Sequence, residues 1–139
     1  GPGKAHPADD AGKNHLQRIY KSAMDQGFGG RIACIDDYDL HVAHFMGQGC
    51  DVWLNTPRKP LEASGTSGMK AAVNGVPHLS IGDGWWAVGY NDANGWLIDG
   101  KCESLDPAEV EAAEADALYR LLETEMVPTF YDRDARGLA

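Results

Sequence analysis

Long apolar runs are missing from this sequence, and none of its stretches approaches the roughly 20 residues that a membrane-spanning helix needs. The amino terminus has no charged segment followed by an apolar stretch, so we expect no secretory signal and a cytoplasmic location. Three widely spaced cysteines, Cys34, Cys50 and Cys102, form no C-x-x-C pair and predict neither a disulfide framework nor a zinc site. His41 and His44 have no third ligand in view, and we assign no metal site.

Positive charge is also scarce, since 12 Lys and Arg residues stand against 21 Asp and Glu residues, for a net charge of −9. Between Asp106 and Glu125, seven acidic residues accompany one arginine, so most of the net charge belongs to one segment. The remaining sequence is nearly balanced and contains no basic stripe. We therefore expect neither a nucleic acid nor an anionic membrane as a partner.

The composition is that of an ordinary globular domain, with 43% apolar and 24% charged residues in a chain of 139. This length fits one core, and we assign residues 1–139 to a single domain. A helix is predicted over residues 12–26, where apolar residues recur at helical spacing and form one stripe. The stripe consists of Leu16, Ile19, Tyr20, Ala23 and Met24.

Strand-like and helix-like segments alternate along the rest of the chain. Strands are predicted over residues 31–35, 51–55, 78–81 and 95–98, and the first two are predicted to be buried. Helices are predicted over 39–46, over about 67–74 and over 107–127, the last capped by Asp106 and ended by Pro128. The stripe predicted to face the core on this last helix is Val110, Ala117, Leu118, Leu121, Leu122 and Met126.

This alternation predicts an α/β fold with a parallel sheet and flanking helices. In such sheets, ligands bind outside the carboxyl ends of the strands. Three loops that follow strands are therefore candidates for one site: residues 36–38, 55–70 and 82–86.

The middle loop has the sharpest chemistry, because residues 64–68 read Ser-Gly-Thr-Ser-Gly and leave backbone N–H groups free to face an anion. We expect Lys70 to lie in the first turn of the following helix, in apolar surroundings that disfavour its ammonium form. A neutral lysine is a nucleophile towards an aldehyde. The alternative is an ordinary surface lysine. The spacing does not fit the phosphate-binding loop of nucleotide triphosphatases.

The segment from Glu62 to Gly75, Glu-Ala-Ser-Gly-Thr-Ser-Gly-Met-Lys-Ala-Ala-Val-Asn-Gly, resembles the cofactor-lysine segment of the glycogen, starch and maltodextrin phosphorylases. Residues 3–7, 51–57, 83–86 and 94–96 resemble further segments of that family. The resemblance implies a Rossmann-like part of the carboxy-terminal domain of a two-domain glycosyltransferase. The implied reaction is reversible phosphorolysis of α-1,4-glucans by inorganic phosphate, which yields glucose 1-phosphate.

The resemblance also implies roles for single residues. Lys70 forms the Schiff base with pyridoxal 5′-phosphate and acts as an anchor rather than as a group that cycles during catalysis. The other implied cofactor-binding residues are Thr66, Ser67 and Tyr38, and the implied residues for the hydroxyl groups of the glucosyl unit are Glu62, Ser64 and Gly65.

Two features resemble the shorter bacterial and archaeal members of the family and not the long animal members: the pair Ser67-Gly68, and Asp39 directly after Tyr38. Whole members are several times longer, so we expect this chain to lack the amino-terminal domain and to be inactive alone. The family is usually dimeric, which makes a homodimer a candidate assembly. Two alternatives remain open: a nucleotide-sugar glycosyltransferase domain, and a non-catalytic module that binds sugar phosphates or glucans.

Overall fold

The computed structural model describes residues 7–25, 27–28, 30–35 and 37–134. The chain divides into two compact units, Gly1–Phe45 and Met46–Ala139, and each is described by itself. Among the described residues, no helix combines the length and the apolar character that a membrane crossing requires.

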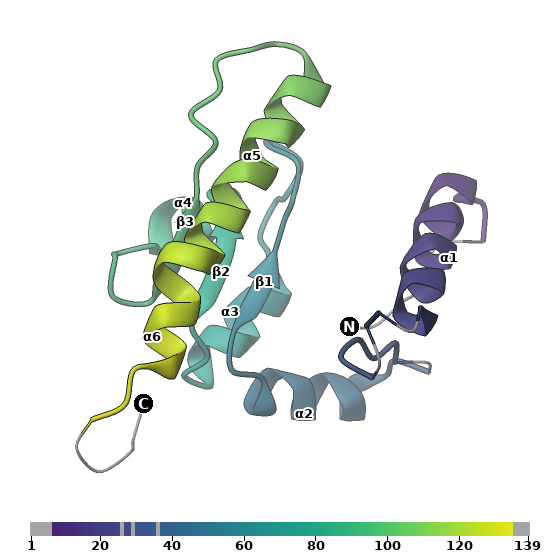
Figure 1. Cartoon of the computed structure of the whole chain (residues 1–139), viewed down its shortest axis with the longest axis horizontal. Coiled ribbons are helices and arrows are strands. Elements are labelled where there is room, and N and C mark those ends of the chain that lie inside the picture. Colours follow the sequence, from purple (N-terminus) through teal and green to yellow (C-terminus); the bar gives the residue numbers. More distant parts are fainter. Residues whose placement is uncertain (1–6, 26, 29, 36, 135–139) are drawn as a thin grey trace. The chain divides into compact units, whose positions relative to one another are not determined.

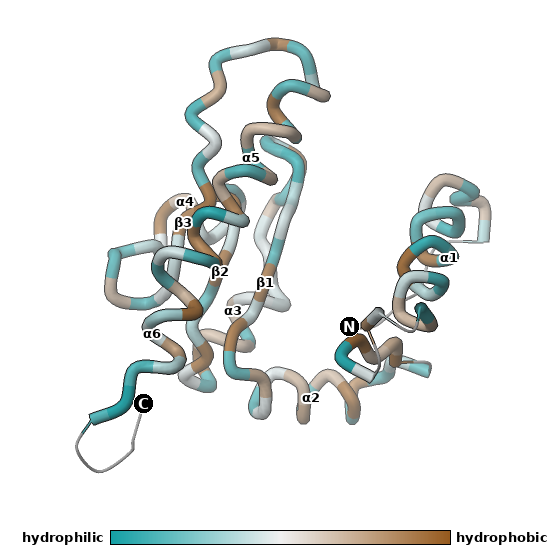
Figure 2. Tube along the Cα trace, viewed as in Figure 1, coloured by the Kyte–Doolittle hydropathy of each residue, from teal (hydrophilic) through white to brown (hydrophobic). Residues whose placement is uncertain are grey.

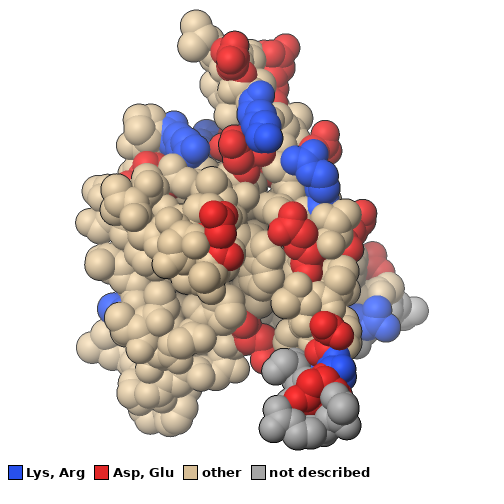
Figure 3. Space-filling view, turned by 90° about the vertical axis from the view of Figure 1, so that its left-hand side faces the viewer, with Lys and Arg blue, Asp and Glu red and all other residues tan. Residues whose placement is uncertain are grey.

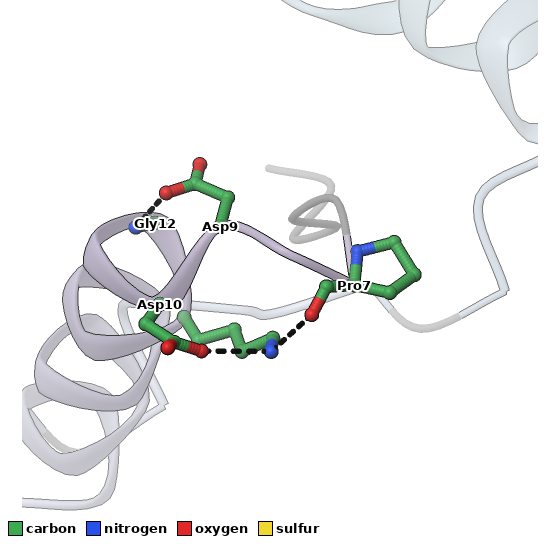
Figure 4. Close-up of polar contacts among 5 residues, drawn as sticks. Pro7, Asp9, Asp10 and Gly12 are labelled. Carbon is green, nitrogen blue, oxygen red and sulfur yellow. Dashed lines mark hydrogen bonds and ion pairs between the residues drawn. The ribbon is translucent and has the colours of Figure 1, made fainter.

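Helix α1 of the first unit, Asp10–Met24, forms close to the predicted range. Asp9 caps it, because its carboxylate accepts a hydrogen bond of 2.9 Å from the Gly12 N–H, and the Lys13 amine contacts the Asp10 carboxylate at 3.0 Å (Figure 4). Of the predicted apolar stripe, only Ala23 is buried, whereas Met24 is 63% exposed. Most of this apolar stripe is therefore not buried by the described residues of this unit.

The strand predicted over residues 31–35 is wrong. Residues 31–34 have no strand structure and are exposed, and Ile35 forms only an isolated bridge. A buried parallel strand needs a hydrogen-bonded neighbour for its N–H and C=O groups, and apolar composition alone does not provide one. Helix α2 follows at Leu40–Gly49, near its predicted position.

A parallel sheet of three strands forms the centre of the second unit (Figure 1). The strands are β1, Trp53–Asn55, β2, His78–Ile81, and β3, Gly95–Ile98, in the order β1-β2-β3. All four residues of β2 are buried because it is the middle strand, whereas the edge strand β1 is shorter than predicted and only half-buried. The predicted α/β class and the parallel sheet are confirmed.

Helices cover both faces of this sheet. Figure 1 shows α5, Pro107–Leu121, in front of the strands, and the helices α3, Thr66–Val73, and α4, Trp86–Gly89, behind them. The hydrophobic core lies under α5 (Figure 2), where each buried Leu or Ile contributes about 1.5–3 kcal/mol. Its buried residues are Leu79, Ile81, Ile98 and Ala117, and Val52, Trp96, Leu118, Leu121 and Leu122 pack around them.

The last helix begins as predicted, because the Asp106 carboxylate accepts a hydrogen bond from the Ala108 N–H and Pro107 occupies the first turn. Its predicted end at Pro128 is wrong. A π-helical turn, Leu122–Met126, leads into α6, Val127–Tyr131, with Pro128 in its first turn. The wider turn, in which the Val127 N–H bonds to the Leu122 carbonyl, accommodates a proline that an unbroken α-helix would exclude.

Ala117, Leu118, Leu121 and Leu122 do face the core, so most of the predicted stripe is confirmed. The acidic residues of this segment are exposed apart from Glu114, which is half-buried. Figure 3 shows charged side chains concentrated on the α5 side of the view and a largely uncharged surface opposite. Most of the net negative charge is therefore a solvated helix face.

Candidate functional site

The carboxyl ends of β1, β2 and β3 lie along one edge of the sheet because the strands are parallel. Two of the predicted loops, 55–70 and 82–86, meet there. The Glu62 N–H donates a hydrogen bond of 2.9 Å to Asp83 Oδ2, and the Trp85 N–H donates one of 2.9 Å to the Ser64 carbonyl. The sequence correctly predicted that these loops converge.

Glycines permit this close approach. Gly65 has φ +76°, and a Cβ on it would lie 3.1 Å from Trp85 Cδ1. Gly84 has φ +53°, and a Cβ there would lie 2.9 Å from the Ser64 carbonyl oxygen. Both positions combine a left-handed backbone with a tight contact, so any other residue would push the two loops apart.

Helix α3 begins at this junction of the two loops. Gly65 is its N-cap residue and has no side chain to accept from the first N–H groups of the helix. Thr66 and Ser67 are both exposed, which leaves their hydroxyl groups accessible. Backbone donors, hydroxyl groups and the positive end of the helix dipole together favour an anion at this position.

Lys70 lies one turn further along α3 and is exposed, so the expected apolar surroundings are not found among the described residues. The reason is the face that α3 buries. Gly68 and Ala71 face inward, whereas Met69 is 42% and Val73 84% exposed. Because α3 begins at Thr66, Lys70 belongs to its second turn and not to the first turn that the sequence predicted. Its exposed side chain is accessible to a ligand from outside.

His78 is a feature that sequence reasoning missed. Its side chain is 1% exposed, and neither ring nitrogen has a hydrogen-bond partner among the described residues. The ring lies against Trp85 and Trp86, at centroid distances of 5.3 and 4.6 Å. Burial lowers the pKa of His78 from 6.5 to about 4, so the imidazole is neutral at pH 7. A histidine at a strand start gives no sequence signal of such packing.

We predict that this histidine makes the fold sensitive to acid. Between pH 6.5 and 4 the unfolded chain binds a proton at His78 that the folded chain does not, so the free energy of unfolding falls as the pH is lowered. At pH 5 the loss is about 2 kcal/mol, at 1.36 kcal/mol per pH unit. Urea unfolding at pH 7.5 and pH 5 measures it.

The variant His78→Leu lacks this loss, and the exposed His15→Leu retains it as a matched control. An equal pH dependence in His78→Leu and the unsubstituted chain would contradict the prediction.

The remaining predicted site residues are distributed over both units of the chain. Ser64 is exposed, and Glu62 is half-buried at the loop junction with Gly65. Tyr38 is half-buried and belongs to the first unit, and the predicted loop 36–38 includes residue 36, which lies outside the described residues. The roles of these residues stay predictions.

The structure thus defines a small α/β chain with an uncapped helix terminus and two interlocked glycine loops at its strand ends, and with an exposed lysine further along α3. Over 98% of its length this chain is homologous to one segment of the glycogen and maltodextrin phosphorylases. It is 56% identical to a glycogen phosphorylase of Aquifex aeolicus, 52% to a maltodextrin phosphorylase of Thermococcus litoralis and 48% to a glycogen phosphorylase of Mycobacterium bovis. The chain spans only 16–19% of the length of these relatives. No family profile and no solved structure matches it.

Proposed function

We propose that this chain is part of the Rossmann-like carboxy-terminal domain of an α-glucan phosphorylase. The reaction is reversible phosphorolysis of α-1,4-glucans, which transfers a terminal glucosyl unit to inorganic phosphate as glucose 1-phosphate. The observation that carries the proposal is the 56% identity to a glycogen phosphorylase across nearly the whole chain. The interlocked loops at the strand ends support it, because they bring the small residues before α3 to the edge where a parallel sheet binds ligands.

Pyridoxal 5′-phosphate is the proposed cofactor, and the residues present fit it. The uncapped amino terminus of α3 with the hydroxyl groups of Thr66 and Ser67 suits an anionic group, and the exposed amine of Lys70 would hold the cofactor covalently. Tyr38 is a further proposed contact. When bound, the cofactor supplies a phosphate group that supports proton transfer to and from the substrate phosphate.

The glucosyl unit is proposed to bind at the loop junction. Glu62 offers a carboxylate to sugar hydroxyl groups, and none of the described residues donates a hydrogen bond to that carboxylate. Ser64 offers an exposed hydroxyl, and Gly65 is proposed to offer its backbone N–H. The three residues are close in sequence and rest on the 82–86 loop, so they present donors and acceptors from one fixed segment.

The chain alone is predicted to be inactive, because it spans 16–19% of the relatives' length. The test is a chimeric enzyme in which this chain replaces the aligned segment of the Aquifex aeolicus phosphorylase. We expect it to release glucose 1-phosphate from maltodextrin at a rate within about tenfold of the parent, a barrier difference of about 1.4 kcal/mol. A chimera that folds and binds the cofactor like the parent yet shows no phosphorolysis would contradict the proposal.

A further inference from the structure

The loop that follows β2 holds the segment proposed to bind the sugar. Asp83 and Glu62 are 21 residues apart in sequence, yet the Glu62 N–H donates a hydrogen bond of 2.9 Å to Asp83 Oδ2. A carboxylate is a stronger acceptor for a backbone N–H than a neutral group. This bond therefore fixes the backbone at the residue whose side chain is proposed to contact substrate.

Asp83 is itself firmly placed. Its own N–H donates to the Ile81 carbonyl at 2.8 Å, and its carbonyl accepts from the Trp86 N–H at 3.2 Å. It thus joins the end of the central strand to the start of α4. Asp83 lies two residues after β2, whose four residues are all buried, so its carboxylate is carried by a loop that starts from a well-packed strand.

Glu62 has no comparable support of its own. It lies in a segment without helix or strand, and the preceding Leu61 is 76% exposed. Its carboxylate receives no hydrogen bond from the described residues, so its direction depends on the backbone that carries it. Gly84 also lies close to the Glu62 side chain, since a Cβ on Gly84 would lie 3.1 Å from Glu62 Cγ.

We propose that Asp83 is a positioning residue, which sets the direction of the Glu62 carboxylate towards the glucosyl unit through the backbone of Glu62. The inference rests on the proposed function for the identity of the substrate and goes beyond it by assigning a role to Asp83. It predicts a defect in substrate binding rather than in the chemical step, because Asp83 is proposed to act through the Glu62 backbone and not through a contact of its own with the substrate.

The first test measures substrate kinetics in the chimeric enzyme. Asp83→Ala raises the KM for glucose 1-phosphate in the direction of glucan synthesis by about 10- to 100-fold, the range expected when a hydrogen bond to a charged group is lost. Asp83→Asn retains an acceptor oxygen and stays within about fivefold of the parent. The matched control is Asp99→Ala, because Asp99 also follows a strand and accepts a backbone N–H, but only from Lys101 nearby.

A double-mutant cycle separates positioning from general stabilisation. If Asp83 acts through Glu62, Asp83→Ala adds less than about twofold to the KM defect of Glu62→Ala. An equal effect of Asp83→Ala in the presence and absence of the Glu62 side chain would overturn the inference. An unchanged KM in Asp83→Ala would also overturn it.

A second measurement is independent of activity and uses the 139-residue chain itself. Asp83→Ala speeds hydrogen exchange of the Glu62 amide by at least about tenfold, whereas Asp83→Asn and Asp99→Ala leave it near the unsubstituted rate. Unchanged exchange would refute positioning even if the chimera proved inactive. Faster exchange together with an inactive chimera would support the contact and reject the proposed function alone.

Discussion

We expect Lys70→Ala to lower phosphorolysis by the chimeric enzyme about a thousandfold or more, because the proposed cofactor, without its anchor, would no longer hold its phosphate in a reactive position. Borohydride reduction of the unsubstituted chimera leaves a pyridoxyl adduct on the peptide that contains Lys70. The Lys70→Ala variant leaves none. Mass spectrometry of the digested enzyme gives this readout separately from activity.

Lys70→Arg distinguishes an anchor from a simple positive charge. A guanidinium group keeps the charge but does not condense with an aldehyde, so we expect Lys70→Arg to be as inactive as Lys70→Ala. Lys101→Ala is the matched control, since Lys101 is an exposed lysine that follows β3 at the same edge of the sheet. Full activity in Lys70→Arg, or an adduct on another lysine, would contradict the assignment.

Much of the second unit could be predicted from the sequence. Its strands β2 and β3 are short, mostly apolar segments with glycines near both ends, and its last helix carries both a capping aspartate and a regular apolar stripe. These signals are local, so they remain readable without tertiary information. Segment 31–35 shows where prediction from local composition fails. Its composition is that of a strand, but a strand forms only if residues distant in sequence pair with it.

The site was predicted in part. Small residues before a helix, placed after a strand, indicated an anion site, and the structure provides an uncapped helix terminus there. The exposure of Lys70 was not predicted, since it depends on which face α3 turns to the sheet. The packing of His78 was missed for the same reason, because both features arise from contacts between elements rather than from periodicity within one.

Gly68 and His78 form the contact that sets how closely α3 approaches the sheet. A Cβ on Gly68 would lie 2.9 Å from His78 Nε2 and closer still to Cε1. The ring has little room to move, because it is buried and packs against Trp85 and Trp86. Gly68→Ala therefore lowers the free energy of unfolding by about 3 kcal/mol, as expected for overpacking a rigid site.

The sign of this effect reverses when the ring is removed. In a His78→Ala background, Gly68→Ala meets no ring and gains the preference of alanine over glycine in helices, a stabilisation of about 0.5–1 kcal/mol. Gly47→Ala in α2 is the control, because a Cβ there has nothing within 4 Å and stabilises in either background. Urea unfolding of the unsubstituted chain, Gly68→Ala, His78→Ala and the double variant tests the contact. A Gly68→Ala effect of the same sign with and without the His78 ring would show that another neighbour limits this position.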